Sequence, residues 1–133
     1  MAEKIRARFD VVEWNNVEPE GSGADGSVTS ALVEKKFRSG LSGTSHATVL
    51  MSRYEGGAAY TAIERFSGAL GDRSGEISFV HGGITSEAGD VPFGYVVPGS
   101  GTDGFAGASG TLAFGHDDEG GFIDFELTLP PQA

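Results

Sequence analysis

Apolar and polar residues alternate with a period of two along most of this sequence. Residues 3–12, EKIRARFDVV, place the apolar residues from Ile5 to Val11 on one face and the charged residues between them on the other. Successive side chains of a β-strand point to opposite faces of the sheet, so this pattern indicates half-buried strands. No segment shows a convincing 3.6-residue helical period, and we expect an all-β protein.

About eight segments of this kind follow one another with short links. They span residues 3–12, 27–37, 44–54, 58–70, 75–81, 91–97, 110–116 and 122–129. Eight strands with one apolar face each can stack as a sandwich or close into an antiparallel barrel, and closure removes exposed strand edges. The 22 glycines of the chain favour closure, because glycine relieves crowding where strands coil. One such device recurs as FRSGLSGTS, FSGALGDRSG and FAGASGTL.

Length and charge limit the classes of function. The 133 residues predict a single β-barrel domain over residues 1–133, and the formal charge of −10 argues against nucleic-acid and anionic membrane partners. The chain has no cysteine, and its start lacks the apolar region of a signal peptide. We therefore expect a soluble cytoplasmic protein.

The segment ERFSGALGDRSGEISFVH, residues 64–81, reads as a hairpin whose turn is GDRS. A two-residue loop at 72–73 or a four-residue loop at 71–74 pairs Glu64 with His81 and Phe66 with Phe79. Tyr60 lies on the same face of this hairpin. The prediction is a carboxylate and an imidazole facing each other on the apolar side of the sheet.

The strand pairing of two further hairpins is predicted with different precision. A loop at 117–120 pairs Phe114 with Ile123 and Leu112 with Phe125, and leaves His116 near a barrel rim. At the EGG loop, residues 55–57, one loop length places His46 on the Glu64 face and the other places Ala47, Val49 and Met51 there. The more apolar set favours the second arrangement slightly.

Glu64 and His81 are the candidate catalytic residues. A buried carboxyl next to an imidazole is a proton-transfer pair when the pKa of each group is poised near neutrality, and a structural hydrogen-bonded couple otherwise. The candidate ligand-binding residues are aromatic: Tyr60, Phe66, Phe79, Tyr95, Trp14 and Phe114.

Metal and cofactor sites are not expected. The three histidines, His46, His81 and His116, match no compact ligand spacing. The GSGTDG run at 99–104 fits a dinucleotide motif only formally, because strand rather than helix is predicted after it.

Two longer stretches carry a resemblance to a known family. IERFSGALGDRSGEISFVHGG (63–83) and VVPGSGTDGFAGASGTLAFGH (96–116) resemble a bacterial family catalogued as a domain of unknown function, which is similar in fold to allene oxide cyclase. The resemblance spans nearly the whole chain and implies a closed barrel of that type. Barrels like allene oxide cyclase include cofactor-free enzymes that close rings in an apolar cavity.

Three functions compete at this stage. The first is an isomerase or cyclase that acts on a small, mostly apolar or partly polar ligand through Glu64 and His81. The second is a non-catalytic carrier or sensor of such a ligand. The third is a structural, self-associating module, since several strand faces carry more apolar residues than one interior absorbs, and a homodimer is one form it would take.

Overall fold

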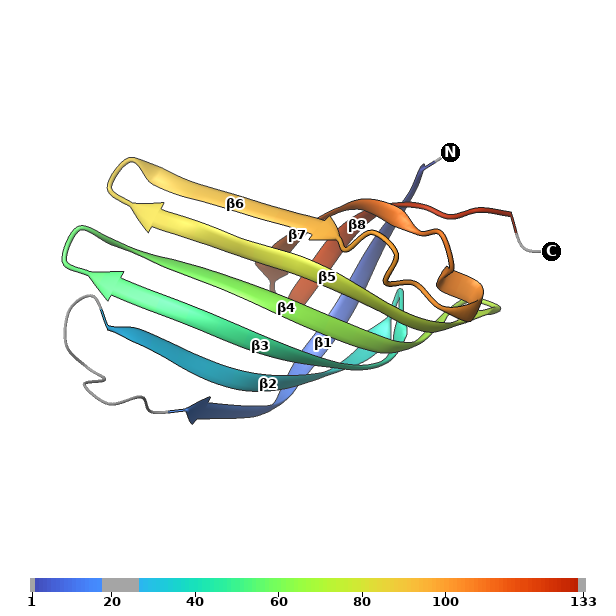
Figure 1. Cartoon of the computed structure of the whole chain (residues 1–133), viewed down its shortest axis with the longest axis horizontal. Helices are drawn as coiled ribbons and strands as arrows, with labels where there is room; N and C mark the ends of the chain where they lie inside the picture. Colours follow the sequence, from blue (N-terminus) through green and yellow to red (C-terminus); the bar gives the residue numbers. More distant parts are fainter. Residues whose placement is uncertain (1, 18–26, 132–133) are drawn as a thin grey trace.

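The computed structural model describes residues 2–17 and 27–131. Eight antiparallel strands form one closed barrel in chain order, with β8 paired to β1 (Figure 1). The elements are β1 (Ala2–Val17), β2 (Val28–Ser39), β3 (Ser42–Tyr54), β4 (Gly57–Leu70), β5 (Arg73–Ser86), β6 (Gly89–Val96), the single-turn 3-10 helix η1 (Asp103–Phe105), β7 (Ser109–Asp117) and β8 (Gly120–Thr128). The predicted all-β closed antiparallel barrel is confirmed.

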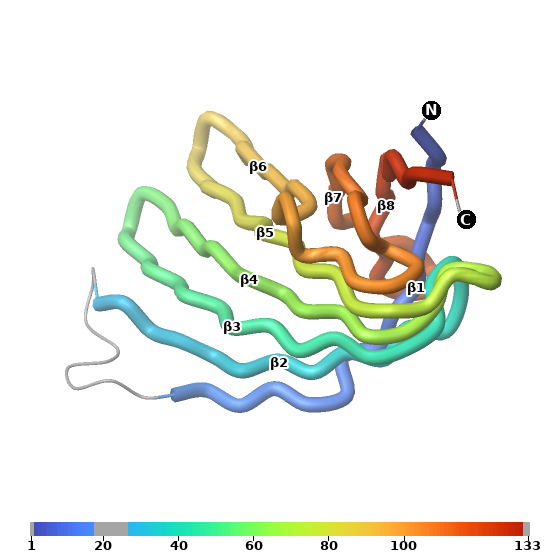
Figure 2. The backbone as a smooth tube through the Cα atoms, turned by 45° about the vertical axis from the view of Figure 1, so that its right-hand side comes forward, coloured from blue at the N-terminus to red at the C-terminus, as the bar shows by residue number. Residues whose placement is uncertain are grey.

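The barrel has two unlike ends. At one end the inward side chains form a dense aromatic core that includes Phe37, Phe66, Phe79 and Phe125. At the other end the tips of β2–β6 extend past β7 and β8, as Figures 1 and 2 show. β6 pairs with β7 only at Tyr95 and Thr111, near the last residue of β6, so the rest of β6 runs toward the open end without a partner in β7.

The predicted pairing of Glu64 with His81 is wrong by two residues. The structure pairs Glu64 with Phe79, Phe66 with Ile77 and Ala62 with His81, because the turn falls at residues 71–72. Gly71 has a φ of 59°, as a two-residue hairpin turn with glycine in its first position requires. A slip of two residues preserves the face of every side chain, so Glu64 and His81 still point inward as diagonal neighbours.

The other two hairpins settle as expected. Phe114 pairs with Ile123 and Leu112 with Phe125. Ala47 pairs with Glu64 across β3 and β4, which places the Ala47 set on the inner face. His46, one residue away, points outward and contacts Glu34 through Nε2 at 3.0 Å.

Glycines let the strands cross closely at the closed end. Gly43, Gly68 and Gly75 pair in one row across β3, β4 and β5. A Cβ on Gly68 would lie 2.1 Å from the backbone oxygen of Ser42, so no larger residue fits without a shift of the strand. Two of the three repeated glycine phrases therefore mark the place where the sheet coils.

The loop after β6 covers the closed end instead of continuing as strand. Its GSGTDG run leads into η1, and β7 begins only at Ser109. Phe105 of η1 is 1% exposed and packs edge-on against Phe66 at a centroid distance of 6.2 Å. The part predicted as a glycine-broken strand is thus a loop with one helical turn. No helix among residues 2–17 and 27–131 is long and apolar enough to cross a membrane.

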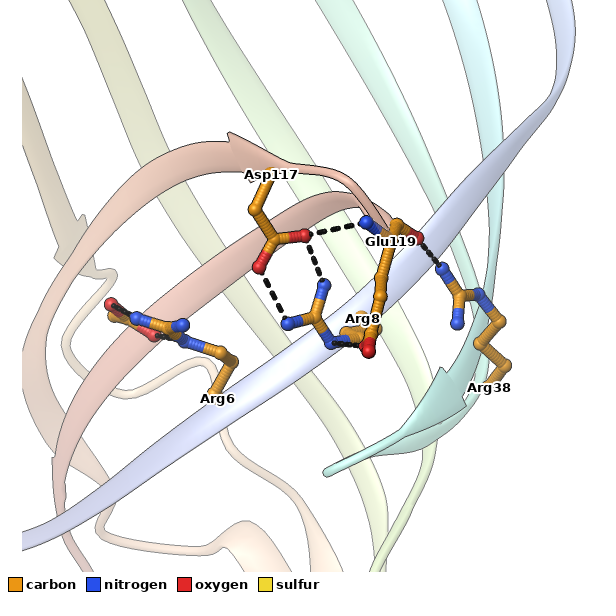
Figure 3. A network of polar contacts seen from close by, with 6 residues as sticks. Arg6, Arg8, Arg38, Asp117 and Glu119 are labelled. Carbon is orange, nitrogen blue, oxygen red and sulfur yellow. Dashed lines mark hydrogen bonds and ion pairs between the residues drawn. The ribbon is translucent and has the colours of Figure 1, made fainter.

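Ion pairs on the outer surface connect β1 with β7 and β8 at the seam, the place where β8 pairs with β1 and closes the barrel (Figure 3). Arg6 of β1 donates two hydrogen bonds to Asp124 of β8, at 2.7 and 2.9 Å. Arg8 donates two to Asp117, both at 2.8 Å. The guanidinium of Arg6 also lies 3.9 Å from the ring centroid of Phe122. Bidentate pairs of this kind fix geometry as well as adding energy, so the charged residues of β1 hold β7 and β8 in place.

Candidate functional site

A cavity of about 580 Å³ occupies the open end of the barrel. Its volume lies within the range of roughly 300–1,000 Å³ that ligand pockets occupy. The cavity exists because the inward residues here are small: Ala31, Ala47, Ala62 and Gly83 stand where the closed end has phenylalanines. Space left by small side chains on a regular sheet becomes a pocket rather than a packed core.

Aromatic, aliphatic and basic side chains make up most of the cavity wall. The residues that line it are Phe9, Trp14, Ser27, Thr29, Val33, Lys35, Ala47, Val49, Met51, Ser52, Arg53, Ala58, Ala59, Tyr60, His81, Gly83, Thr85 and Phe114. Lys35 and Arg53 are the charged members, and no aspartate or glutamate belongs to this set, although acidic residues outnumber basic ones by 19 to 9 in the chain. The wall is therefore mostly apolar, and both of its charged members are cations.

Glu64 lies just beneath the cavity floor and has no exposed surface. Its Oε1 accepts hydrogen bonds from Lys35 Nζ and His81 Nε2, both at 2.9 Å. Its Oε2 accepts one from Ser45 Oγ at 2.5 Å. Strands β2, β3 and β5 thus each contribute one donor to a hydrogen-bond network whose central acceptor is the Glu64 carboxylate of β4. Among the described residues, no buried side-chain nitrogen or oxygen lacks a partner.

The network keeps Glu64 ionised. Burial by itself raises the pKa of this carboxyl, but the hydrogen bond from His81, the positive charge of Lys35 and the hydroxyl of Ser45 outweigh burial and lower the pKa to about 2. The prediction of a carboxyl poised near neutrality is therefore wrong for Glu64, because it omitted Lys35 and Ser45. At neutral pH this glutamate is a fixed anion that orients its neighbours.

His81 links the buried anion to the cavity. A carboxylate only accepts hydrogen bonds, so Nε2 of His81 donates to Glu64, and in the neutral ring Nδ1 is then an acceptor. The Tyr60 hydroxyl lies 3.3 Å from this Nδ1. Burial and the charge of Glu64 raise the pKa of Tyr60, which keeps its hydroxyl protonated. The result is a chain of donors and acceptors from Glu64 through His81 to a hydroxyl on the cavity wall.

Lys35 brings a buried ammonium group to the same floor. Only 8% of its side chain is exposed, and Nζ lies 4.6 Å from the ring centroids of both Phe9 and Phe114. Cation–π contacts and the ion pair with Glu64 together hold this charge within an apolar wall. The sequence reasoning missed Lys35, although it alternates in step with Val33 and Phe37 and so had to share their inward face.

The comparisons with known proteins agree with this fold. The model of the DUF3224 family, described as a protein of unknown function, matches residues 5–129. The chain belongs to the DUF3224 family. A crystal structure of a DUF3224 protein of unknown function from Shewanella oneidensis MR-1 is similar, with a TM-score of 0.85 and 27% sequence identity over 99% of this chain and 100% of that one. No curated protein matches.

Besides Glu64 beneath the floor, the predicted site residues of this DUF3224 barrel occupy three different places. Trp14, Tyr60, His81 and Phe114 line the cavity. Phe66 and Phe79 are 0% and 1% exposed in the aromatic core of the closed end, so they support the floor and do not line the cavity. Tyr95 is 53% exposed on the outer surface, since it pairs with Val80 on the outward face of β5 and β6. Its expected place in the cavity is wrong.

The three histidines of this DUF3224 chain lie apart. His46 is on the outer face of β3, His81 on the inner face of β5, and His116 is exposed beside the β7–β8 turn. Within the part of the chain that the structure describes, no three side chains of His, Asp or Glu gather in a metal-binding arrangement.

Proposed function

We propose that this DUF3224 protein binds a small, mostly apolar molecule in the open end of its barrel. The observation that carries this proposal is an apolar cavity of about 580 Å³ whose floor is a fully satisfied polar network. Pockets of this composition, with few and well-placed polar groups, are the usual form of small-molecule sites. The fold alone supports a carrier or sensor as readily as an enzyme.

The polar groups of the wall select the polar end of the ligand. Lys35 presents N–H donors at the floor, and Arg53 presents a guanidinium near the cavity with no ion pair to a described residue. The Tyr60 hydroxyl donates its hydrogen to His81 Nδ1 and leaves its oxygen as an acceptor beside the cavity. Because none of the lining residues within 2–17 and 27–131 is a carboxylate, a ligand with a carbonyl, carboxylate or other acceptor group meets attraction in the cavity, whereas a cation meets Lys35 and Arg53. We infer a ligand with an apolar body and an acceptor head. A cytoplasmic location and the lack of nucleic-acid or membrane partners stay predictions from composition.

The substitution Gly83→Leu tests the cavity as the binding site. Gly83 faces inward on β5, and the heavy atom nearest to a Cβ there is Tyr60 Cε1 at 3.6 Å, an ordinary contact. The leucine side chain then occupies ligand space without backbone strain. With anilinonaphthalene sulfonate as an apolar anionic probe, we expect affinity to fall at least roughly tenfold, the effect of losing about 1.4 kcal/mol of contact.

Trp14 supplies the readout for that experiment. It is the only tryptophan of the chain and lines the cavity, so energy transfer from its indole to the bound probe reports binding at this place. Gly56→Leu is the matched control, because a Cβ at Gly56 meets nothing within 4 Å. Equal probe affinity in wild type and Gly83→Leu, with Gly56→Leu unchanged, would place binding elsewhere.

A second candidate function is isomerisation or ring closure, as in barrels similar to allene oxide cyclase. The observation that favours it is the hydrogen-bonded chain of Glu64, His81 and Tyr60, in which Glu64 orients an imidazole and Tyr60 supplies a protonated hydroxyl. In such a site the Tyr60 hydroxyl turns its hydrogen from His81 Nδ1 to a substrate oxygen, where it stabilises developing charge. The freed Nδ1 of His81 then accepts a proton, and the cavity excludes water. Glu64 acts here as a positioning residue that accepts a hydrogen bond from His81 and does not itself transfer a proton.

The isomerisation of cyclohex-3-enone to its conjugated isomer is a minimal probe of this second function, since it moves one proton from the α-carbon to the γ-carbon. We expect wild type to accelerate the change in ultraviolet absorbance. Tyr60→Phe should lower the rate roughly 10²-fold or more, the usual contribution of one acid–base group. A Glu64→Gln variant as fast as wild type would remove the oriented imidazole from the chemistry.

A further inference from the structure

The outer face of β2–β6 carries no charged side chain in its three rows toward the open end of the barrel. The outward side chains of β2–β6 form three rows across the open part of the sheet, as the strand register defines them. The rows are Leu32, Thr48, Ile63, Val80 and Tyr95; Ser30, Leu50, Thr61, Gly82 and Phe93; and Val28, Ser52, Ala59, Ile84 and Val91. In a chain with 21% charged residues, a solvated face of this size would include several.

The bounds of this uncharged face are sharp. The next row toward the closed end holds Glu34 and His46, whose side chains contact each other at 3.0 Å, and Arg65, which forms an ion pair with Glu76. On the far side of the barrel, β1, β7 and β8 carry the paired arginines and aspartates of the seam. An antiparallel sheet with one face in water normally shows polar side chains on that face. The outer face of β2–β6 instead has the composition of the inside of a β-sandwich.

The area exposed on this face is large. Eight of its side chains (Val28, Leu32, Leu50, Ile63, Ile84, Val91, Phe93 and Tyr95) are between 42% and 64% exposed. At roughly 150–200 Å² for a full side chain of this size, the eight expose on the order of 700 Å². The largest apolar patch of a typical monomer is about 300–600 Å², and a stable interface buries about 800 Å² on each partner.

We propose that two copies of this chain pack their β2–β6 outer faces against each other across a two-fold axis. Figures 1 and 2 show β2–β6 side by side as one broad sheet, which presents a continuous surface to a partner. Two sheets stack face to face when branched aliphatic side chains interdigitate between them. Phe93 contributes to a smooth surface, because its ring lies over the backbone of Gly82.

Area and charge together favour a second copy as the partner. Each chain carries a formal charge of −10, which opposes contact between charged surfaces of two copies, and this face is a zone without carboxylates where that repulsion is least. An anionic lipid surface would need a basic rim around the apolar patch. The bordering row instead mixes Glu34 with His46 and Arg65 within a strongly acidic chain. Apart from Ser52 and Ala59, which also border the cavity, no residue of these rows belongs to the ligand site, so the two proposals are tested separately.

Light scattering coupled to size-exclusion chromatography tests the proposal on the full chain. We expect wild type at tens of micromolar to show twice the 13.7 kDa mass of one chain. Ile63→Glu and, separately, Leu50→Glu place a carboxylate in the middle of the buried zone and should each give the mass of one chain. Both positions are about half exposed in one chain, so the variants should keep the wild-type circular dichroism.

Val12→Glu is the matched control, because Val12 is 52% exposed on β1, outside the uncharged face. It should leave the doubled mass unchanged. A wild type with the mass of one chain would overturn the proposal, and so would folded Ile63→Glu and Leu50→Glu variants that keep the doubled mass. A loss of the dimer in Val12→Glu but not in the other two would move the interface to β1 and equally overturn it.

Discussion

Replacing Lys35 by methionine is expected to lower the free energy of unfolding by about 3 kcal/mol. Glu64 has no exposed surface, and Lys35 Nζ is one of its three hydrogen-bond donors. Removing one partner of a buried ion pair leaves the other charge in a medium that solvates it poorly, which costs about 3–5 kcal/mol. We expect the lower end of this range because His81 and Ser45 still donate to the carboxylate.

Urea unfolding followed by circular dichroism measures this effect, and Lys36→Met supplies the control. Lys36 is the next residue of β2, points outward and is exposed, so the same change of charge there should shift stability by no more than about 0.5 kcal/mol. The double variant Lys35→Met/Glu64→Gln should regain a large part of the loss, since neutral replacements for both partners of a buried pair are often well tolerated. If Lys35→Met costs no more than Lys36→Met, the ammonium does not compensate Glu64.

The fold was predictable because alternation of side chains survives uncertainty about loops. Every strand of this barrel has apolar residues at alternate positions along its inner face, and a closed meander of eight such strands buries that face. This alternation alone was enough to place Glu64 and His81 on the inner face. Their direct pairing did not follow, because the position of the turn depends on the backbone conformation of Gly71, which the sequence around GDRS does not determine.

The alternation of residues does not show which face of a strand points inward when both faces are apolar. In VPFGYVV, residues 91–97, either set of alternate residues could face inward, and the prediction placed Tyr95 on the wrong face. The structure turns Gly94 and Val96 inward and leaves Phe93 and Tyr95 outside. The same two-sided apolar character in β2–β6 produces the uncharged outer face. Apolar residues on both faces of these strands therefore explain two things: the wrong face predicted for Tyr95, and the outer face that is available for association.

The sequence did not show how far along the barrel axis each inward side chain lies. Phe66, Glu64 and Tyr60 share one face of β4, yet they lie in the packed core, beneath the cavity floor and on the cavity wall, respectively. Which level is empty depends on the size of residues contributed by other strands, such as Ala31 and Gly83. Those residues become neighbours only once the register of several hairpins is known, so the cavity required the structure.

Acidification should destabilise wild type more steeply than the Glu64→Gln variant. In the folded protein the pKa of Glu64 is about 2, against an ordinary value of 4.5, because the His81 hydrogen bond, the charge of Lys35 and the Ser45 hydroxyl outweigh burial. A depressed pKa in the folded state contributes stability that is present above about pH 4.5 and is lost as the pH falls toward 2. At about 1.4 kcal/mol per pKa unit, this contribution is about 3 kcal/mol.

The measurement is the free energy of unfolding between pH 6 and pH 2, from urea titrations of both proteins. Glu64→Gln should be the less stable protein at pH 6, and the gap should narrow by about 3 kcal/mol toward pH 2. Asp117 and Asp124, whose pKa values Arg8 and Arg6 lower, remain in both proteins, so their effect cancels in the difference. Glu76→Gln makes the same substitution at the exposed partner of Arg65 and should follow wild type. Parallel curves for wild type and Glu64→Gln would mean that Glu64 is not held as an anion, and the oriented imidazole of the candidate site would lose its support.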